Sequence, residues 1–123
     1  MKARNAVDSS GWLEYFADTS RAKLFAPAIE DAAALVVPVL SVYEVFKKFL
    51  RERGETDALQ AVSAMRSGLV VDLDVSLSLE AARLDLPLAD SLIYATARRH
   101  DATLWTQDED FKNLPGVRYF PKK

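Results

Sequence analysis

The 123-residue sequence predicts an α/β fold in which a mostly parallel central sheet carries helices on both faces. Short apolar, β-branched runs alternate along the chain with longer segments whose apolar residues recur at the spacing of a helix. No linker, repeat or low-complexity tract interrupts this alternation. Because the length is typical of one domain, residues 1–123 are expected to form a single domain with a continuous core.

The predicted strands are short and apolar, and turn or helix signals bound each of them. They cover residues 4–7, 35–38, 69–73, 103–106 and 117–120. Pro38 has no amide hydrogen to donate to a neighbouring strand. It must therefore either end the second strand or lie at an edge of the sheet.

The predicted helices follow these strands and begin or end at recognisable capping residues. Ser9 and Ser10 offer hydroxyl oxygens that can cap the first helix, and Gly54 and Gly68 end two later ones. The six helices are expected at residues 11–18, 22–31, 41–53, 56–67, 76–84 and 88–99.

The composition excludes several kinds of site. The chain has no cysteine and one histidine, which rules out disulfides, thiolate metal sites and the common zinc sites. Sixteen basic and eighteen acidic residues give a formal charge of -2, which argues against binding nucleic acid through the overall field. The longest apolar stretch, residues 32–40, is too short to span a bilayer, and the N-terminus does not resemble a secretion signal. A cytoplasmic location without a membrane anchor is therefore expected.

Carboxylates occur at the joints where a strand-like run gives way to a helix-like segment. In a parallel sheet the carboxyl ends of the strands share one edge, so residues that are distant in sequence meet in one crevice there. Crowded carboxylates resist ionisation unless a cation lies among them, and hard cations such as Mg²⁺ and Mn²⁺ prefer oxygen ligands. The pattern predicts a divalent-metal site that supports phosphodiester hydrolysis, formed from Asp8, Glu44, Asp90 and Asp108, with Asp110 two residues beyond the last.

Several of these acids have a purely structural alternative. Acids near helix N-termini, such as Asp8 and Asp90, are stabilised by capping and by the helix dipole. Ser41 and Glu44 fit a capping box, and Glu44 with Lys48 forms an i,i+4 pair in the favourable order. The set as a whole still favours a metal, because an uncharged Ser, Thr or Asn could cap a helix equally well.

The turn after the fourth strand is the feature that capping explains least. Asp108, Glu109 and Asp110 form a cluster of like charges, which is costly on a turn. Thr106 and Glu109 nevertheless fit a second capping box. Asp108 and Asp110 are both candidates for the fourth metal ligand.

Four motifs occur in order along the chain: Val7-Asp8-Ser9-Ser10, Leu40-Ser41-Val42-Tyr43-Glu44, residues 86–97 around Leu88-Ala89-Asp90-Ser91, and Leu104-Trp105-Thr106-Gln107-Asp108-Glu109-Asp110-Phe111. In this order they resemble the motifs of the PIN-domain ribonucleases, specifically the VapC toxins of VapBC toxin–antitoxin systems. Ser9 stands where the family often has threonine, and the helix before Asp90 is abbreviated. The resemblance implies a PIN-like three-layer α/β fold over essentially the whole chain.

The resemblance also implies an activity: a divalent-metal-dependent endoribonuclease that hydrolyses RNA with a metal-activated water. The metal ligands and catalytic residues would be Asp8, Glu44, Asp90 and Asp108, holding one or two Mg²⁺ or Mn²⁺ ions. Asp110 would act directly or through water, and Ser9 and Thr106 would orient the carboxylates by hydrogen bonds. The implied partners are an RNA substrate, a small VapB-like antitoxin and a second copy of the chain in a homodimer.

Two other functions compete with this interpretation. Asp8 ends the first strand and could be the nucleophile of an aspartyl-phosphate phosphohydrolase, although the second aspartate of the phosphatase motif and a lysine at the end of a late strand are both missing. The chain could also be a non-catalytic interaction module whose acids only cap helices.

Overall fold

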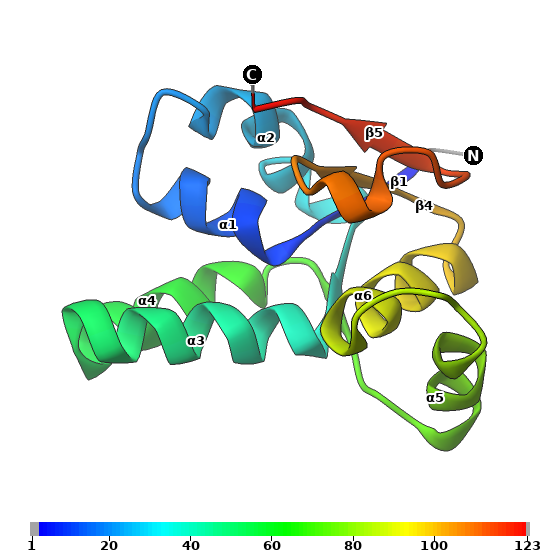
Figure 1. Cartoon of the computed structure of the whole chain (residues 1–123). Coiled ribbons are helices and arrows are strands. Elements are labelled where there is room, and N and C mark those ends of the chain that lie inside the picture. The colour runs from blue at the N-terminus through cyan, green and yellow to red at the C-terminus, as the bar shows by residue number, and fades with distance from the viewer. Residues whose placement is uncertain (1–2, 123) are drawn as a thin grey trace.

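The computed structural model describes residues 3–122, and its centre is a five-stranded sheet with the order β3-β2-β1-β4-β5 (Figure 1). Each strand is parallel to its neighbours, which confirms the predicted α/β class with a parallel sheet. The strands are β1 (Arg4–Val7), β2 (Leu35–Pro38), β3 (Leu69–Val71), β4 (Ala102–Thr106) and β5 (Val117–Tyr119).

Within residues 3–122, six α-helices and two short 3₁₀ segments connect the strands. All predicted elements are present, with bounds that differ from the expected ones by no more than two residues. Among the described residues, no helix is both long and apolar enough to cross a bilayer. The helices are α1 (Ser9–Phe16), α2 (Ala22–Ile29), α3 (Val39–Arg53), α4 (Glu55–Met65), α5 (Val75–Ala82) and α6 (Leu88–Arg99), and the 3₁₀ segments are η1 (Ala32–Ala34) and η2 (Glu109–Phe111).

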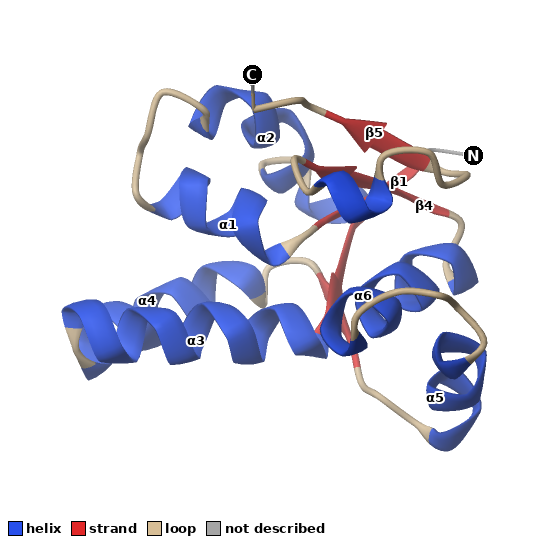
Figure 2. Ribbon diagram, in the orientation of Figure 1, coloured by secondary structure: helices blue, strands red, loops and turns tan. Residues whose placement is uncertain are grey.

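The alternation of side chains along the strands divides the core into two layers. Val7, Val37 and Trp105 pack with buried residues of α1, α2, α3 and α4. Ala6 and Leu104 face the other way and pack with residues of α6 and η2. Figure 2 shows the strands running between these helices. The predicted arrangement, with helices on both faces of the sheet, is therefore confirmed.

The strand order changes direction at β1, and this determines where a site can form. The chain builds β1, β2 and β3 outward to one side and then returns to place β4 and β5 on the other side of β1. In an open parallel sheet, the carboxyl ends of the strands on either side of such a switch border a crevice. Asp8 follows β1 and Asp108 follows β4, so both lie at this crevice.

The cap of α1 is Asp8, in the capping role that was the structural alternative for this residue, and not Ser9 or Ser10. Asp8 is the N-cap residue, and its Oδ1 accepts a hydrogen bond from the Gly11 amide at 3.0 Å. Ser9 and Ser10 are the first two residues of the helix. A carboxylate satisfies the free amides and also interacts favourably with the helix dipole, which explains why the acid takes the position expected for a serine.

The start of α3 also differs from the prediction, because the Ser41–Glu44 capping box does not form. The helix begins at Val39, directly after Pro38, which is its N-cap residue and makes no side-chain capping bond. Ser41 is already inside the helix, and its hydroxyl is buried with no hydrogen-bond partner among the described residues. Pro38 ends β2 with an extended backbone that leads straight into the helix, so the start moves two residues upstream.

Candidate metal centre

Acidic side chains from four different elements line one hollow of about 320 Å³ at the carboxyl edge of the sheet. They are Asp8 after β1, Glu44 on α3, Asp90 on α6 and Asp108 after β4. The structure therefore brings together all four carboxylates that the sequence pattern placed at the joints. The other residues that line this hollow are Ser9, Ser10, Leu13, Lys48 and Ile93.

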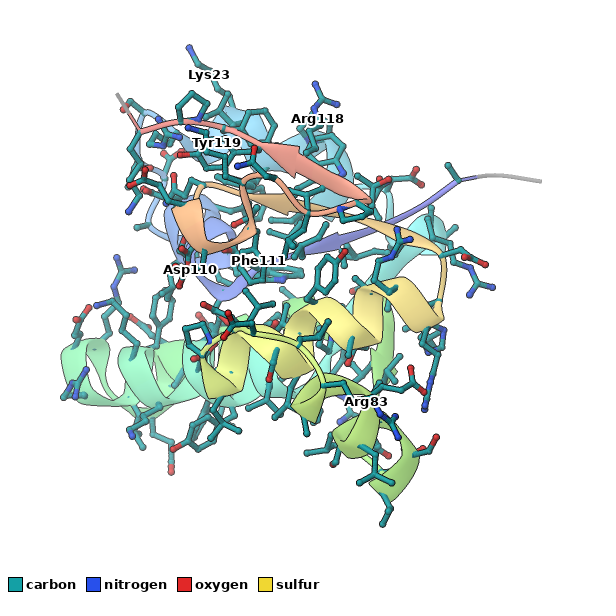
Figure 3. The ribbon with its side chains drawn as sticks, turned by 45° about the vertical axis from the view of Figure 1, so that its right-hand side comes forward. Lys23, Arg83, Asp110, Phe111, Arg118 and Tyr119 are labelled. Atoms are coloured by element: carbon teal, nitrogen blue, oxygen red, sulfur yellow. The ribbon has the colours of Figure 1, made fainter. Side chains whose placement is uncertain are left out.

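The tightest cluster consists of Asp90, Asp108 and Asp110. One carboxylate oxygen from each lies within 4.8 Å of the other two. Oxygens on opposite sides of a bound Mg²⁺ are about 4.2 Å apart, so small side-chain movements would let the three share one ion. Asp108 and Asp110 thus both lie beside Asp90, and both stay candidates for the fourth ligand. Figure 3 shows Asp110 next to Phe111 on η2.

Asp8 is held more rigidly than the other carboxylates. It is only 4% exposed, and each of its oxygens accepts a hydrogen bond. Gly11 donates its amide to Oδ1 at 3.0 Å, and the Thr106 hydroxyl donates to Oδ2 at 2.6 Å. A side chain on Gly11 would clash, because a Cβ there would lie 2.6 Å from Cγ1 of Val7. This close contact between α1 and β1 fixes the amide that holds Asp8.

Thr106 and Ser9 both contact a carboxylate, as expected for residues that orient metal ligands. The Thr106 hydroxyl donates to Asp8 and also accepts the Asp108 amide at 2.9 Å, so it joins two of the candidate ligands. Ser9 donates its hydroxyl to Oε1 of Glu44 at 2.5 Å. These bonds fix the orientation of carboxylates that come from different elements.

The capping box predicted for Thr106 and Glu109 is wrong. The cap of η2 is Asp108, whose Oδ1 accepts the Asp110 amide at 2.9 Å. Thr106 still belongs to β4, and its hydroxyl is already bonded to Asp8 and to the Asp108 amide. Asp108, and not Thr106, therefore caps η2 with one of its carboxylate oxygens.

The pairing of Lys48 was also predicted incorrectly. Its ammonium lies 2.9 Å from a carboxylate oxygen of Glu52, one turn further along α3, and the i,i+4 pair with Glu44 is not seen among the described ion pairs. Glu44 instead accepts the hydroxyl of Ser9. The Lys48 side chain nevertheless lines the acidic hollow.

Two carboxylates of this site, Asp8 and Asp90, resist ionisation, as their raised pKa values show. Burial raises the pKa of Asp8 to about 6, helped by the charges of Asp108 and Glu44 and opposed by hydrogen bonds from Thr106 and Gly11. Burial, followed by the charge of Asp108, raises the pKa of Asp90 to about 7, and Asp110 adds to the effect. A site with this excess of negative charge and only oxygen donors fits a divalent cation such as Mg²⁺ or Mn²⁺.

Gln107 is a residue at this site that the sequence did not point to. It is 3% exposed and lies between Thr106 and Asp108. Its amide nitrogen donates to Ser10 at 3.0 Å and to Glu14 at 2.8 Å, and its oxygen accepts a bond from Arg21 at 2.5 Å. This network ties the turn after β4 to α1 and to the start of α2. The only sequence signal was a polar side chain between a buried strand and the acidic cluster.

Replacing Thr106 by valine is expected to lower the free energy of unfolding by about 1–3 kcal/mol, because a buried oxygen of Asp8 and the Asp108 amide both lose a partner. It should also weaken Mn²⁺ binding by about 10–100-fold, the range found when a hydrogen bond to a ligand is removed. Urea denaturation and calorimetric titration measure these two effects. Thr106→Ser keeps the hydroxyl and is the control, so equal behaviour of the two variants would show that the hydroxyl orients nothing.

The raised pKa values predict how the stability of the metal-free protein depends on pH. The pKa of Asp8 is near 3.8 in the unfolded chain and about 6 in the folded one, so the folded state binds more protons between these values. The contribution of Asp8 to stability should therefore fall by about 2–3 kcal/mol as the pH rises from about 4 to about 7. The total should level off only at about pH 8, because the pKa of Asp90 is about 7 in the folded chain. Asp90 acts in the same direction.

Urea denaturation in EDTA between pH 4.5 and 8 measures this dependence. The double variant Asp8→Asn, Asp90→Asn should lose most of it, and saturating Mg²⁺ should suppress it in the unmodified protein because the cation favours the ionised carboxylates. An identical pH profile for the double variant and the unmodified protein would contradict the assignment.

Comparisons with known proteins agree with the architecture. Residues 6–117 match the PIN domain family. A toxin–antitoxin complex from Klebsiella pneumoniae superimposes with a TM-score of 0.77, 22% identity and coverage of 93% of this chain and 95% of that one. The Mycobacterium tuberculosis toxin VapC20, described as cleaving the sarcin–ricin loop, superimposes with a TM-score of 0.74 and 21% identity. The match covers 94% of this chain and 98% of that one.

A third solved structure, DNA-bound VapBC from Salmonella typhimurium, has a TM-score of 0.73 and 11% identity and covers 97% of this chain and 98% of that one. No curated protein sequence matches the chain. The fold similarity thus extends over nearly the whole length of each of these toxin structures. Since the family match also covers most of the sequence, the chain belongs to the PIN domain family.

Proposed function

We propose that the chain is a divalent-metal-dependent endoribonuclease and the toxin of a toxin–antitoxin pair. The observation that carries the proposal is the convergence of Asp8, Glu44, Asp90 and Asp108 on one hollow at the carboxyl edge of the sheet. Membership of the PIN domain family and the fold shared with VapC-type toxins support the same function.

The residues divide into roles according to their contacts. Asp90, Asp108 and Asp110 would hold a Mg²⁺ or Mn²⁺ ion, since their oxygens already lie close together. Asp8 and Glu44 add two more carboxylates to the lining of the acidic hollow. The hydroxyls of Thr106 and Ser9 donate hydrogen bonds to them and keep them in place. When bound, the metal would activate a water and offset charge on the attacked phosphate.

We propose that the substrate is RNA with an unpaired segment, since a cleft of this kind reaches a phosphodiester most readily in a single-stranded loop. The neighbouring structures include VapBC complexes, so the proposed partner is a small VapB-like antitoxin. A homodimer and a cytoplasmic site of action belong to the same proposal.

The two competing functions fit the contacts less well. An aspartyl-phosphate mechanism needs Asp8 to attack a phosphoryl group, but its side chain is 4% exposed and each oxygen is held by a hydrogen bond. An interaction module whose acids only cap helices would account for Asp8 and Asp108, which do cap α1 and η2. It would leave Glu44 unexplained, because this residue lies in the interior of α3.

Cleavage of total bacterial RNA by the purified chain tests the proposal. Fragments should appear with Mg²⁺ or Mn²⁺ and disappear with EDTA, and sequencing of their ends should locate the cut. Because the nucleophile is a water, the products should carry no 2′,3′-cyclic phosphate. Cleavage that persists in EDTA and leaves cyclic phosphate ends would contradict the proposal and indicate attack by the neighbouring 2′-hydroxyl.

A further inference from the structure

A second hollow, of about 610 Å³, adjoins the acidic one and shares two of its lining residues, Ser10 and Asp108. Its remaining lining residues are Glu109, Asp110, Tyr119 and Lys122. The two hollows therefore lie on either side of the Asp108 turn, with the cluster of Asp90, Asp108 and Asp110 between them. Together they outline a track that crosses the candidate metal centre.

Each end of this track has one cation among the described lining residues, while its middle is acidic. Lys48 lies in the wall of the first hollow, one turn after Glu44 on α3. Lys122 lies in the wall of the second. A chain of phosphates entering this track would meet a positive charge, then a strongly negative centre, and then a second positive charge.

Tyr119 gives the second hollow an aromatic wall. The strand register pairs Trp105 with Arg118 and Thr106 with Tyr119, so these two residues of β5 face opposite sides of the sheet. The guanidinium of Arg118 lies 4.4 Å from the centre of the Trp105 ring, and Figure 3 shows Arg118 on the side of β5 away from η2. Tyr119 therefore lies on the side of Thr106 and η2, where its half-buried ring can stack with a base.

We propose that these hollows bind a single-stranded RNA segment that crosses Asp108, with one phosphate on Lys48, the scissile phosphate at the acidic cluster and a phosphate on Lys122. A base adjoining the Lys122 phosphate stacks on Tyr119. This inference rests on the proposed nuclease function and adds the route of the substrate. The physical reason is that the acidic centre alone would repel RNA, whereas two anchored phosphates hold the one between them in place.

The chain offers matched controls for both lysines. Lys47 is next to Lys48 on α3, but its ammonium lies 5.5 Å from the centre of the Tyr43 ring and 3.3 Å from the tyrosine hydroxyl. Lys112 follows η2, is exposed and is not among the lining residues of either hollow. Replacing any of the four lysines by alanine changes the net charge equally, and Lys48→Ala additionally removes the ion pair with Glu52.

The first test measures binding of a fluorescent single-stranded oligouridylate of about eight nucleotides in Mg²⁺ at several salt concentrations. Lys48→Ala and Lys122→Ala should each weaken binding by about tenfold and reduce the slope of log K against log salt by about 0.7, the loss of one phosphate contact. Lys47→Ala and Lys112→Ala should leave both values unchanged. Equal effects of all four substitutions would overturn the proposed track, because they would reflect overall charge alone.

The second test uses the RNA that the chain is found to cleave. Lys48→Ala and Lys122→Ala should raise KM by about tenfold with little change in kcat, and Tyr119→Leu should raise KM while Tyr119→Phe, which keeps the ring, should not. Cleavage by the unmodified chain with no effect of these substitutions would overturn the track and leave the nuclease function standing. Lysine-dependent binding without any cleavage would overturn the nuclease function and leave the track standing.

Discussion

Replacing Asp90 by asparagine is expected to abolish RNA cleavage while making the metal-free protein harder to unfold. The variant turns one of three clustered carboxylates, whose oxygens lie within 4.8 Å of one another, into a neutral amide, so Mn²⁺ binding should weaken sharply. The rate should fall by at least about 10²–10³-fold, the usual cost of losing one preorganised group that stabilises charge in a transition state. The gain in stability follows because the variant relieves repulsion with Asp108 and Asp110.

Three measurements check this prediction: the initial rate of RNA cleavage, calorimetric titration with Mn²⁺, and urea denaturation in EDTA at pH 8. Asp85→Asn is a matched control, because it removes one negative charge from an exposed residue between α5 and α6 that does not line the acidic hollow. It should behave like the unmodified protein in all three. If Asp90→Asn kept more than about a tenth of the rate, Asp90 would not be a metal ligand.

The position of the site could be predicted because it depends on local pattern and on topology. Each strand was recognisable from its apolar run, and a parallel arrangement brings the ends of the strands to one edge. Asp8 follows β1 directly, Asp108 lies two residues after the adjacent strand β4, and Asp90 is in the first turn of the helix that packs beside them. The convergence of these acids therefore follows from the order of the elements, without knowledge of any side-chain contact.

The caps could not be predicted, because several polar residues competed for each helix start. Asp8, Ser9 and Ser10 can all cap α1, and packing of α1 against β1 selects the first of them. For α3, the backbone after Pro38 is already directed into the helix, so the capping box at Ser41 is not needed. The choice in both cases depends on how the helix packs, which the local sequence does not contain.

Contacts between distant residues were the other feature beyond prediction. Gln107 bonds to Arg21, which is separated from it by 86 positions, and to Glu14, separated by 93. Lys122 reaches the wall of the second hollow only because β5 lies beside β4. Such contacts exist only after the sheet has formed, and the sequence alone gives these residues no distinguishing pattern.

Replacing Phe111 by alanine is expected to lower the free energy of unfolding by about 3–5 kcal/mol and also to weaken metal binding. The Phe111 side chain is fully buried and packs against Tyr94 of α6, with ring centres 6.3 Å apart. Tyr94 in turn donates its hydroxyl to the carbonyl of Pro115 at 2.7 Å. Phe111 thus anchors η2, which carries Asp110, onto the helix that carries Asp90 (Figure 3).

The loss of stability alone would not show that Phe111 holds the site together, and a second buried residue separates the two effects. Met65 on α4 is also fully buried and does not line the acidic hollow, so Met65→Ala should cost about 2–5 kcal/mol without changing metal affinity. Metal binding stabilises the folded state by RT ln(1 + [L]/Kd), so a fixed Mn²⁺ concentration should raise the melting temperature less in Phe111→Ala than in Met65→Ala. Equal increases would mean that η2 keeps its place without Phe111. A smaller increase for Phe111→Ala would show that this ring sets the distance between Asp90 and the carboxylates of the turn, and therefore that the core on this face of the sheet builds the metal centre.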